Sequence, residues 1–193
     1  MWEESIRQPM IFKIGSSYRP NTKVDALVEY IDIVPTILDL LGINSLPEAQ
    51  GASFRQSLAA GAEHKEMAFS EYLHDNMAMV CDKKWKYVFT TGSRDLGIDY
   101  QTGYGPSGIV HRLYDLENDP SESRSVAHIA ENAEILKAMQ FQMLKKFEQT
   151  HPEAENCPKD LSLEGKLVWY CEPRDIGFDP LQKAYPTRVF KQD

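Results

Sequence analysis

Residues 67–91 read MAFSEYLHDNMAMVCDKKWKYVFTT, and this stretch decides the fold. It contains three short runs of apolar and aromatic residues, separated by the polar turns at 74–76 and 82–84. In the third run, side chains from Trp85 onward alternate between aromatic residues on one side and Lys86 and Val88 on the other. A period of two is typical of a β-strand with two different faces. The three runs therefore predict an antiparallel meander.

The pattern continues on the C-terminal side. A long glycine-rich loop at 92–108 leads to a fourth predicted strand at 110–116, which ends in a turn signal. Apolar residues then recur at helical spacing over 130–149. We expect residues 151–193, which contain scattered aromatics and prolines, to wrap the surface and pack locally.

The N-terminal side differs in character. Residues 9–14, PMIFKI, read as a buried strand, which usually needs neighbouring strands on both sides. Residues 32–41 predict a helix with Asp32 as its N-cap, Pro35 in its first turn and Gly42 just past its end. A connector rich in proline, glycine and alanine follows at 46–61.

Composition excludes some classes of function. The chain has 193 residues, of which 42% are hydrophobic, and a formal net charge of −8, which disfavours nucleic-acid binding. The sequence contains no apolar run long enough to span a membrane, and its first residues do not read as a signal peptide, so we assign no compartment. Three cysteines cannot form a complete disulfide framework, and whether Cys157 pairs with Cys171 stays open.

Five stretches resemble, in order and spacing, motifs of sulfatases of the alkaline phosphatase superfamily. Each stretch alone is a weak signal, but the ordered set is specific. The matching segments are WEESIRQP at 2–9, IDIVPTILDLLG at 31–42, GASF at 51–54, the strand at 79–87 and RLYDLENDPSE at 112–122.

The resemblance implies an α+β fold in three parts. Residues 1–61 correspond to the end of an α/β sulfatase domain, a strand plus a helix, followed by the connector. Residues 62–150 correspond to the C-terminal subdomain, a four-stranded antiparallel sheet packed with a C-terminal helix. Residues 151–193 form a C-terminal extension.

The same resemblance implies a formylglycine nucleophile in a Cys/Ser-x-Pro-x-Arg motif and a divalent cation, usually calcium, in the full-length enzyme. In Cys171-Glu172-Pro173-Arg174 the arginine follows one position too early for that motif. The family's nucleophile and metal-binding positions would precede Met1. We therefore expect no catalytic residue, metal ligand or cofactor in this chain, and no sulfate-ester hydrolysis by the chain alone.

Part of the substrate pocket could remain, because loops of this subdomain help to select substrates in the family. The predicted substrate-binding residues lie in the first hairpin turn and the long loop. The alternative is that these residues are simply exposed in turns and bind no substrate. Lys83, Lys84 and Lys86 read either as a basic patch for an anionic sugar or as a solvated strand edge. The predicted binding residues are His74, Asp75, Asn76, Arg94 and Tyr100.

Three functions compete. The first is a fold-completing part of a sulfatase that acts on sulfated carbohydrate. The second is a non-catalytic module that binds a glycan or a protein, and the third is part of a related phosphonate or phosphate monoester hydrolase. The strand at 9–14 and the helix at 32–41 would expose apolar surface, so we expect either self-association or docking on the N-terminal part of a sulfatase, or disorder of residues 1–50.

Overall fold

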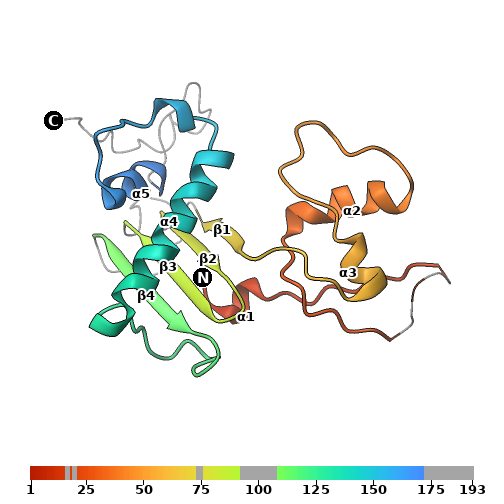
Figure 1. The fold of residues 1–193 in the computed structure, drawn as a ribbon, viewed down its shortest axis with the longest axis horizontal. Helices are drawn as coiled ribbons and strands as arrows, with labels where there is room; N and C mark the ends of the chain where they lie inside the picture. Colours follow the sequence, from red (N-terminus) through yellow and green to blue (C-terminus); the bar gives the residue numbers. More distant parts are fainter. Residues whose placement is uncertain (16–17, 19–20, 73–75, 92–107, 172–193) are drawn as a thin grey trace, which may run out of the picture.

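The structure of the protein is a computed structural model, which describes residues 1–15, 18, 21–72, 76–91 and 108–171. Figure 1 shows a sheet with its helices at one end and a segment of long loops and two short helices at the other. The first residues of the chain lie against the sheet, so the chain runs out from the sheet and returns to it.

The sheet is the predicted antiparallel meander. Its strand order is β1-β2-β3-β4, and each neighbouring pair is antiparallel. Tyr72 pairs with Met77 across the first hairpin, and Trp85 pairs with Asp115 across the last pair of strands. The four-stranded prediction is therefore confirmed. The strands span Ala68–Tyr72 (β1), Met77–Cys81 (β2), Trp85–Thr90 (β3) and Val110–Asp115 (β4).

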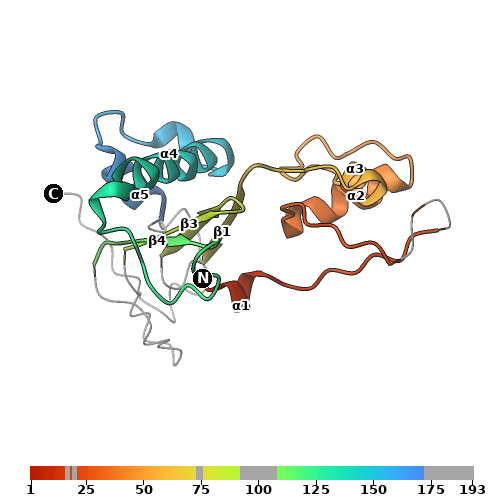
Figure 2. The same cartoon turned by 60° about the horizontal axis from the view of Figure 1, so that its bottom comes forward.

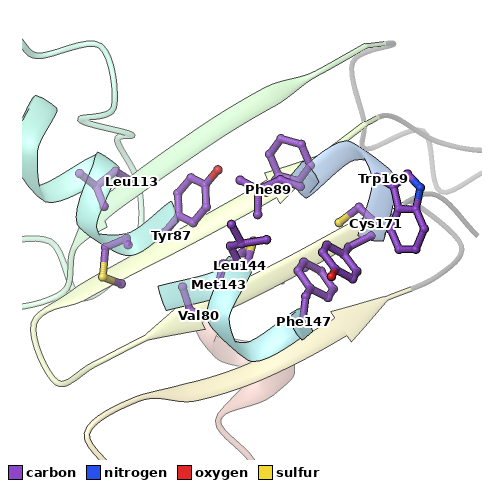
Figure 3. Close-up of a cluster of buried hydrophobic side chains, with 13 residues drawn as sticks. Val80, Tyr87, Phe89, Leu113, Met143, Leu144, Phe147, Trp169 and Cys171 are labelled. Carbon is purple, nitrogen blue, oxygen red and sulfur yellow. The ribbon is translucent and has the colours of Figure 1, made fainter. Parts of the chain in front are cut away.

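Two helices cover one face of the sheet (Figure 2). The helix α4 spans Ala133–Thr150 after the short 3-10 turn Ala130–Asn132, and α5 spans Leu163–Cys171 after the 3-10 turn Ala154–Asn156. Their apolar side chains and those of the strands form the main core (Figure 3). The buried residues at its centre are Val80, Tyr87, Phe89, Leu113, Met143, Phe147 and Leu167.

The opposite face of the sheet carries a smaller cluster. Met77, Met79 and Val88 point to this side, and Met1 and Ile6, the last residue of the helix α1 (Glu3–Ile6), pack against them. Figure 2 shows α1 and the helices α4 and α5 on opposite sides of the sheet. The alternation predicted for β3 is thus confirmed, with Tyr87 and Phe89 on the helix-covered face and Val88 on the other.

The segment between α1 and β1 contains the predicted helix. The 3-10 turn η1 spans Tyr30–Asp32 and leads directly into α2, Ile33–Leu40, while α3 spans Arg55–Ala60. Gly42 has a φ of +70°, the left-handed conformation expected just past a helix end. Asp32 stands at the N-cap position, but its side chain makes no capping hydrogen bond.

Two predictions were wrong. Residues 9–14 form no strand, because an apolar run becomes a strand only against a hydrogen-bonding partner and none of the described residues pairs with it. The extension was predicted to wrap the surface and pack locally, yet its described part contains α5, of which Leu167, Trp169 and Tyr170 are buried in the main core. A helix as short as α5 is not stable through its own sequence, so burial against the existing core must stabilise it.

Candidate functional site

Of the five predicted substrate-binding residues, the structure describes only Asn76. It stands directly before β2, is 4% exposed, and has a φ of +44°, which is uncommon for a residue other than glycine. Its backbone carbonyl accepts a hydrogen bond of 3.2 Å from the amide of Thr91, just after β3. His74, Asp75, Arg94 and Tyr100 lie outside the described residues.

Two buried polar atoms at this end of the sheet have no hydrogen-bond partner in the part of the chain that the structure describes. They are Oδ1 of Asn76 and Oγ1 of Thr91. Leaving such a group unpaired costs about 1–3 kcal/mol, so native proteins usually satisfy it with a water or a bound group. A side-chain carbonyl and a hydroxyl are suited to an uncharged donor such as a sugar hydroxyl.

The lysines at 83, 84 and 86 do not form a basic patch. Lys83 pairs with Glu63, and Lys84 pairs with Glu117 at 2.9 Å, both near the surface. Lys86 is fully buried, so the prediction of a solvated strand edge is wrong at that position. Lys86 is therefore not available to an anionic sugar, and the charges of Lys83 and Lys84 are each balanced by a neighbouring carboxylate.

Lys86 belongs to a buried ion-pair network that joins three distant segments. Its Nζ lies 2.5 Å from Oε1 of Glu122 and 3.2 Å from Oε1 of Glu3. The other carboxylate oxygen of Glu122 accepts a 2.7 Å hydrogen bond from the amide of Glu3. Nearby, the ring of Trp2 contacts that of Tyr114, with centroids 5.8 Å apart. The motifs around residues 2–9, 79–87 and 112–122 therefore meet in one structural contact.

Asp32 organises a second network. Its Oδ1 accepts hydrogen bonds from the Ala52 amide at 2.9 Å and from Lys65 at 2.8 Å. Its Oδ2 accepts one from the amide of Glu29 at 2.9 Å and lies 3.2 Å from Nε2 of His64. Burial alone would raise the pKa of Asp32, but the hydrogen bonds from Lys65, Ala52 and Glu29 outweigh it and hold the pKa below its usual value.

The motifs at 31–42 and 51–54 meet in this second network. Besides the bond to Ala52, the hydroxyl of Thr36 accepts a 3.0 Å hydrogen bond from the amide of Phe54. A side chain at Gly51 would overlap the backbone carbonyl of Ile31, so this crossing requires glycine. These motif residues thus hold distant segments together, and the sequence carried no signal for their pairing because the partners lie far apart along the chain.

Neither a metal cluster nor a membrane helix is found where the structure describes the chain. Residues 1–15, 18, 21–72, 76–91 and 108–171 contain no group of three His, Cys, Asp or Glu side chains placed to hold a metal ion. No helix within those ranges is long and apolar enough to cross a bilayer. Cys81, Cys157 and Cys171 are not in disulfides, and burial raises the pKa of the Cys81 thiol to about 12.

A model of the family described as N-sulphoglucosamine sulphohydrolase, C-terminal, matches residues 1–149. That range covers most of the chain and ends within α4. The chain belongs to this family of sulfatases. It corresponds to a C-terminal portion, and its α+β fold is shared with a solved sulfatase structure. The resemblance identified from the five motifs is confirmed.

Three known proteins illustrate the likeness. Arylsulfatase K of Mus musculus is 29% identical over 140 residues, which cover 66% of this chain and 23% of the relative. Delta 4,5-hexuronate-2-O-sulfatase of Bacteroides thetaiotaomicron is 26% identical over 137 residues, covering 70% of this chain and 27% of the relative. The structure of a phosphonate monoester hydrolase from Silicibacter pomeroyi matches with a TM-score of 0.55 at 22% identity, over 77% of this chain and 30% of that one.

The chain therefore spans about a quarter of the length of these curated relatives. The likeness to the phosphonate monoester hydrolase shows a shared fold only, because the sequence identity is low.

Proposed function

We propose that this chain is the C-terminal part of a sulfatase that acts on sulfated carbohydrate, and that it completes the enzyme's fold by docking on the remaining part. The exposed apolar surface between residues 11 and 46 carries this proposal. Surface of this kind rarely faces water in a finished protein, where it marks an interface.

The helix α2 shows the surface most clearly. Val34, Ile37 and Leu41 lie on one side at helical spacing, and 52%, 44% and 67% of each is exposed. The unpaired segment at 9–14 adds Ile11, which is 92% exposed. About three-quarters of the length of each curated relative lies outside the matched region and would supply chain to cover both. The other large exposed apolar residues in this stretch are Tyr30, Ile31, Ile43 and Leu46.

We expect the 193-residue chain to self-associate through this surface. The double variant Val34→Lys/Leu41→Lys should weaken association at least about ten-fold, since it removes roughly 1.5–3 kcal/mol of burial per side chain. Sedimentation velocity over a wide range of concentration measures the effect. The matched control is Phe141→Lys on α4, a side chain that is also half exposed but lies outside the surface.

If the wild-type chain stays monomeric at every concentration, self-association through α2 is wrong. If Phe141→Lys weakens association as much as the double variant, the contact lies elsewhere. A non-catalytic module with a protein partner would instead show a monomer whose α2 surface binds that partner.

We further propose that Asn76 lines the carbohydrate pocket, with His74, Asp75, Arg94 and Tyr100 as further candidates. The buried and unpaired Oδ1 of Asn76 supports this role, as does its left-handed backbone. The resemblance implies calcium in the longer enzyme, but the described residues offer no metal cluster. We propose no catalytic or metal-binding residue in this chain, and expect no hydrolysis of sulfate esters by the chain alone.

The variant Asn76→Gly tests the pocket, because glycine keeps the positive φ and removes only the amide side chain. Losing one hydrogen bond worth about 0.5–1.5 kcal/mol should weaken binding of a sulfated disaccharide roughly two- to ten-fold in titration calorimetry. Asn118→Gly is the control, since Asn118 bonds Asp115 at the other end of the sheet. Equal affinities of Asn76→Gly and wild type, or no binding by wild type, would contradict the assignment.

A further inference from the structure

The C-terminal extension is built into the core although it lies beyond the residues that match the family. The match ends at Gln149, whereas α5 begins at Leu163. Leu167 of α5 is fully buried, and the ring of Tyr170 stacks on that of Phe147 with centroids 5.2 Å apart and 5° between the planes. The extension is therefore attached to α4 and the sheet by apolar packing.

A polar contact fixes the other end of α5. Oε2 of Glu164 lies 2.9 Å from Nε2 of His111, in β4. On the other side of the same ring, Nδ1 of His111 lies 2.7 Å from the hydroxyl of Tyr87 in β3 and 3.3 Å from Nε2 of Gln140 in α4. One imidazole thus joins two strands and two helices.

The partners determine how the ring is held. Burial raises the pKa of Tyr87, so its hydroxyl stays protonated and can donate. With the hydroxyl of Tyr87 and the amide of Gln140 both facing Nδ1, the consistent tautomer of a neutral His111 has Nδ1 as acceptor and Nε2–H donating to Glu164. Only 20% of the His111 side chain is exposed, so its orientation is set by these contacts.

His111 lies at the end of the sheet where the long loop begins and ends. It is the second residue of β4 and pairs with Phe89, next to the last residue of β3. Its ring also packs against Phe89, with centroids 5.1 Å apart. Fixing this ring therefore fixes the two strand ends that residues 91–109 connect.

We propose that residues 154–171 act as a clamp on this end of the sheet, and that His111 is the positioning residue through which Glu164 holds the start of β4. The clamp goes beyond the fold-completing role and does not depend on carbohydrate binding. In a chain without the extension, the same strand ends would be held by their ladder hydrogen bonds and α4 alone.

Hydrogen exchange on the 193-residue chain tests the clamp. Glu164→Ala should raise exchange about two- to ten-fold in residues 110–113 as well as in α5, because the contact crosses from one to the other. Exchange in β1 and β2 should not change. The matched control is Glu148→Ala, whose carboxylate also faces α5, 3.8 Å from Lys166, but does not touch His111.

A second variant separates the clamp from ordinary support of the helix. His111→Gln should raise exchange in the same two regions, and adding Glu164→Ala to it should change little more, because both remove one contact. Three results would overturn the proposal: a rise confined to α5, an equal rise over the whole sheet, or the same profile for Glu148→Ala. Each would mean that the contact between Glu164 and His111 does not hold the start of β4, and each is independent of any binding measurement.

Discussion

The variant Lys86→Met should lower the free energy of unfolding by about 3–5 kcal/mol. Methionine fills the space of the lysine stem, so the loss comes from charge and not from volume. Without the ammonium group, the carboxylate of Glu122 stays buried beside Glu3 with no opposite charge. Equilibrium unfolding in urea, followed by tryptophan fluorescence, measures the difference.

Lys84→Met is the matched control for this experiment. Lys84 lies two positions away and also pairs with a carboxylate, but about half of its side chain is exposed. Exposed pairs contribute little, so we expect a loss below about 1 kcal/mol. Similar losses for the two variants would show that the buried network is not a special source of stability. A third variant, Glu3→Gln, should lose an intermediate amount of unfolding free energy, because Lys86 keeps its ion pair with Glu122.

The second large effect is expected at Phe147. Replacing it with alanine should cost about 3–5 kcal/mol, since the fully buried ring packs edge-on against Phe69 at 5.3 Å and stacks on Tyr170 at 5.2 Å. The cavity would open where β1, α4 and α5 meet (Figure 3). Urea unfolding again provides the measurement. Phe147→Leu should lose less free energy of unfolding than Phe147→Ala, because leucine fills part of the space.

Phe141→Ala provides the comparison within the same helix. Phe141 lies six residues earlier on α4 and is 51% exposed, so its loss should cost less than about 1 kcal/mol. A large effect at Phe141 with a small one at Phe147 would reverse the assignment of the buried face of α4. The helical spacing in the sequence already places Phe147, and not Phe141, with Met139 and Met143.

Local patterns predicted the elements that depend on local signals. Alternation from Trp85 and the polar turns located all four strands, and the spacing over 130–149 located α4 within a few residues. The failures share a cause. Residues 9–14 have the composition of a strand but no partner in the described chain, and α5 is short and becomes stable by burial.

One signal for α5 was present. The hydroxyl of Ser162 accepts a 3.0 Å hydrogen bond from the amide of Gly165, as an N-cap serine does. The prolines and acidic residues around Ser162 are typical of turns, so the N-cap serine did not stand out as the start of a helix. In α5, Leu163, Leu167 and Tyr170 recur at helical spacing, but nine residues are too few to distinguish this from chance.

The candidate site was predictable only in part. Sequence placed Asn76 in the first hairpin turn, which is correct, but could not show that its side chain is buried opposite Thr91. Nor could it show that Lys86 is buried, because lysine is usually solvated and its partner Glu122 stands 36 residues later. Contacts at such separations follow from the fold and have no local pattern.

The contact of Glu3 with both Lys86 and Glu122 has a mechanical consequence. Because the amide and the carboxylate of one residue are both engaged, the first helical turn can neither slide nor rotate without leaving a buried charge uncovered. Any polypeptide joined ahead of Trp2 would therefore enter this region from a fixed point and in a fixed direction. The turn is thus anchored to the sheet through both the backbone and the side chain of a single residue.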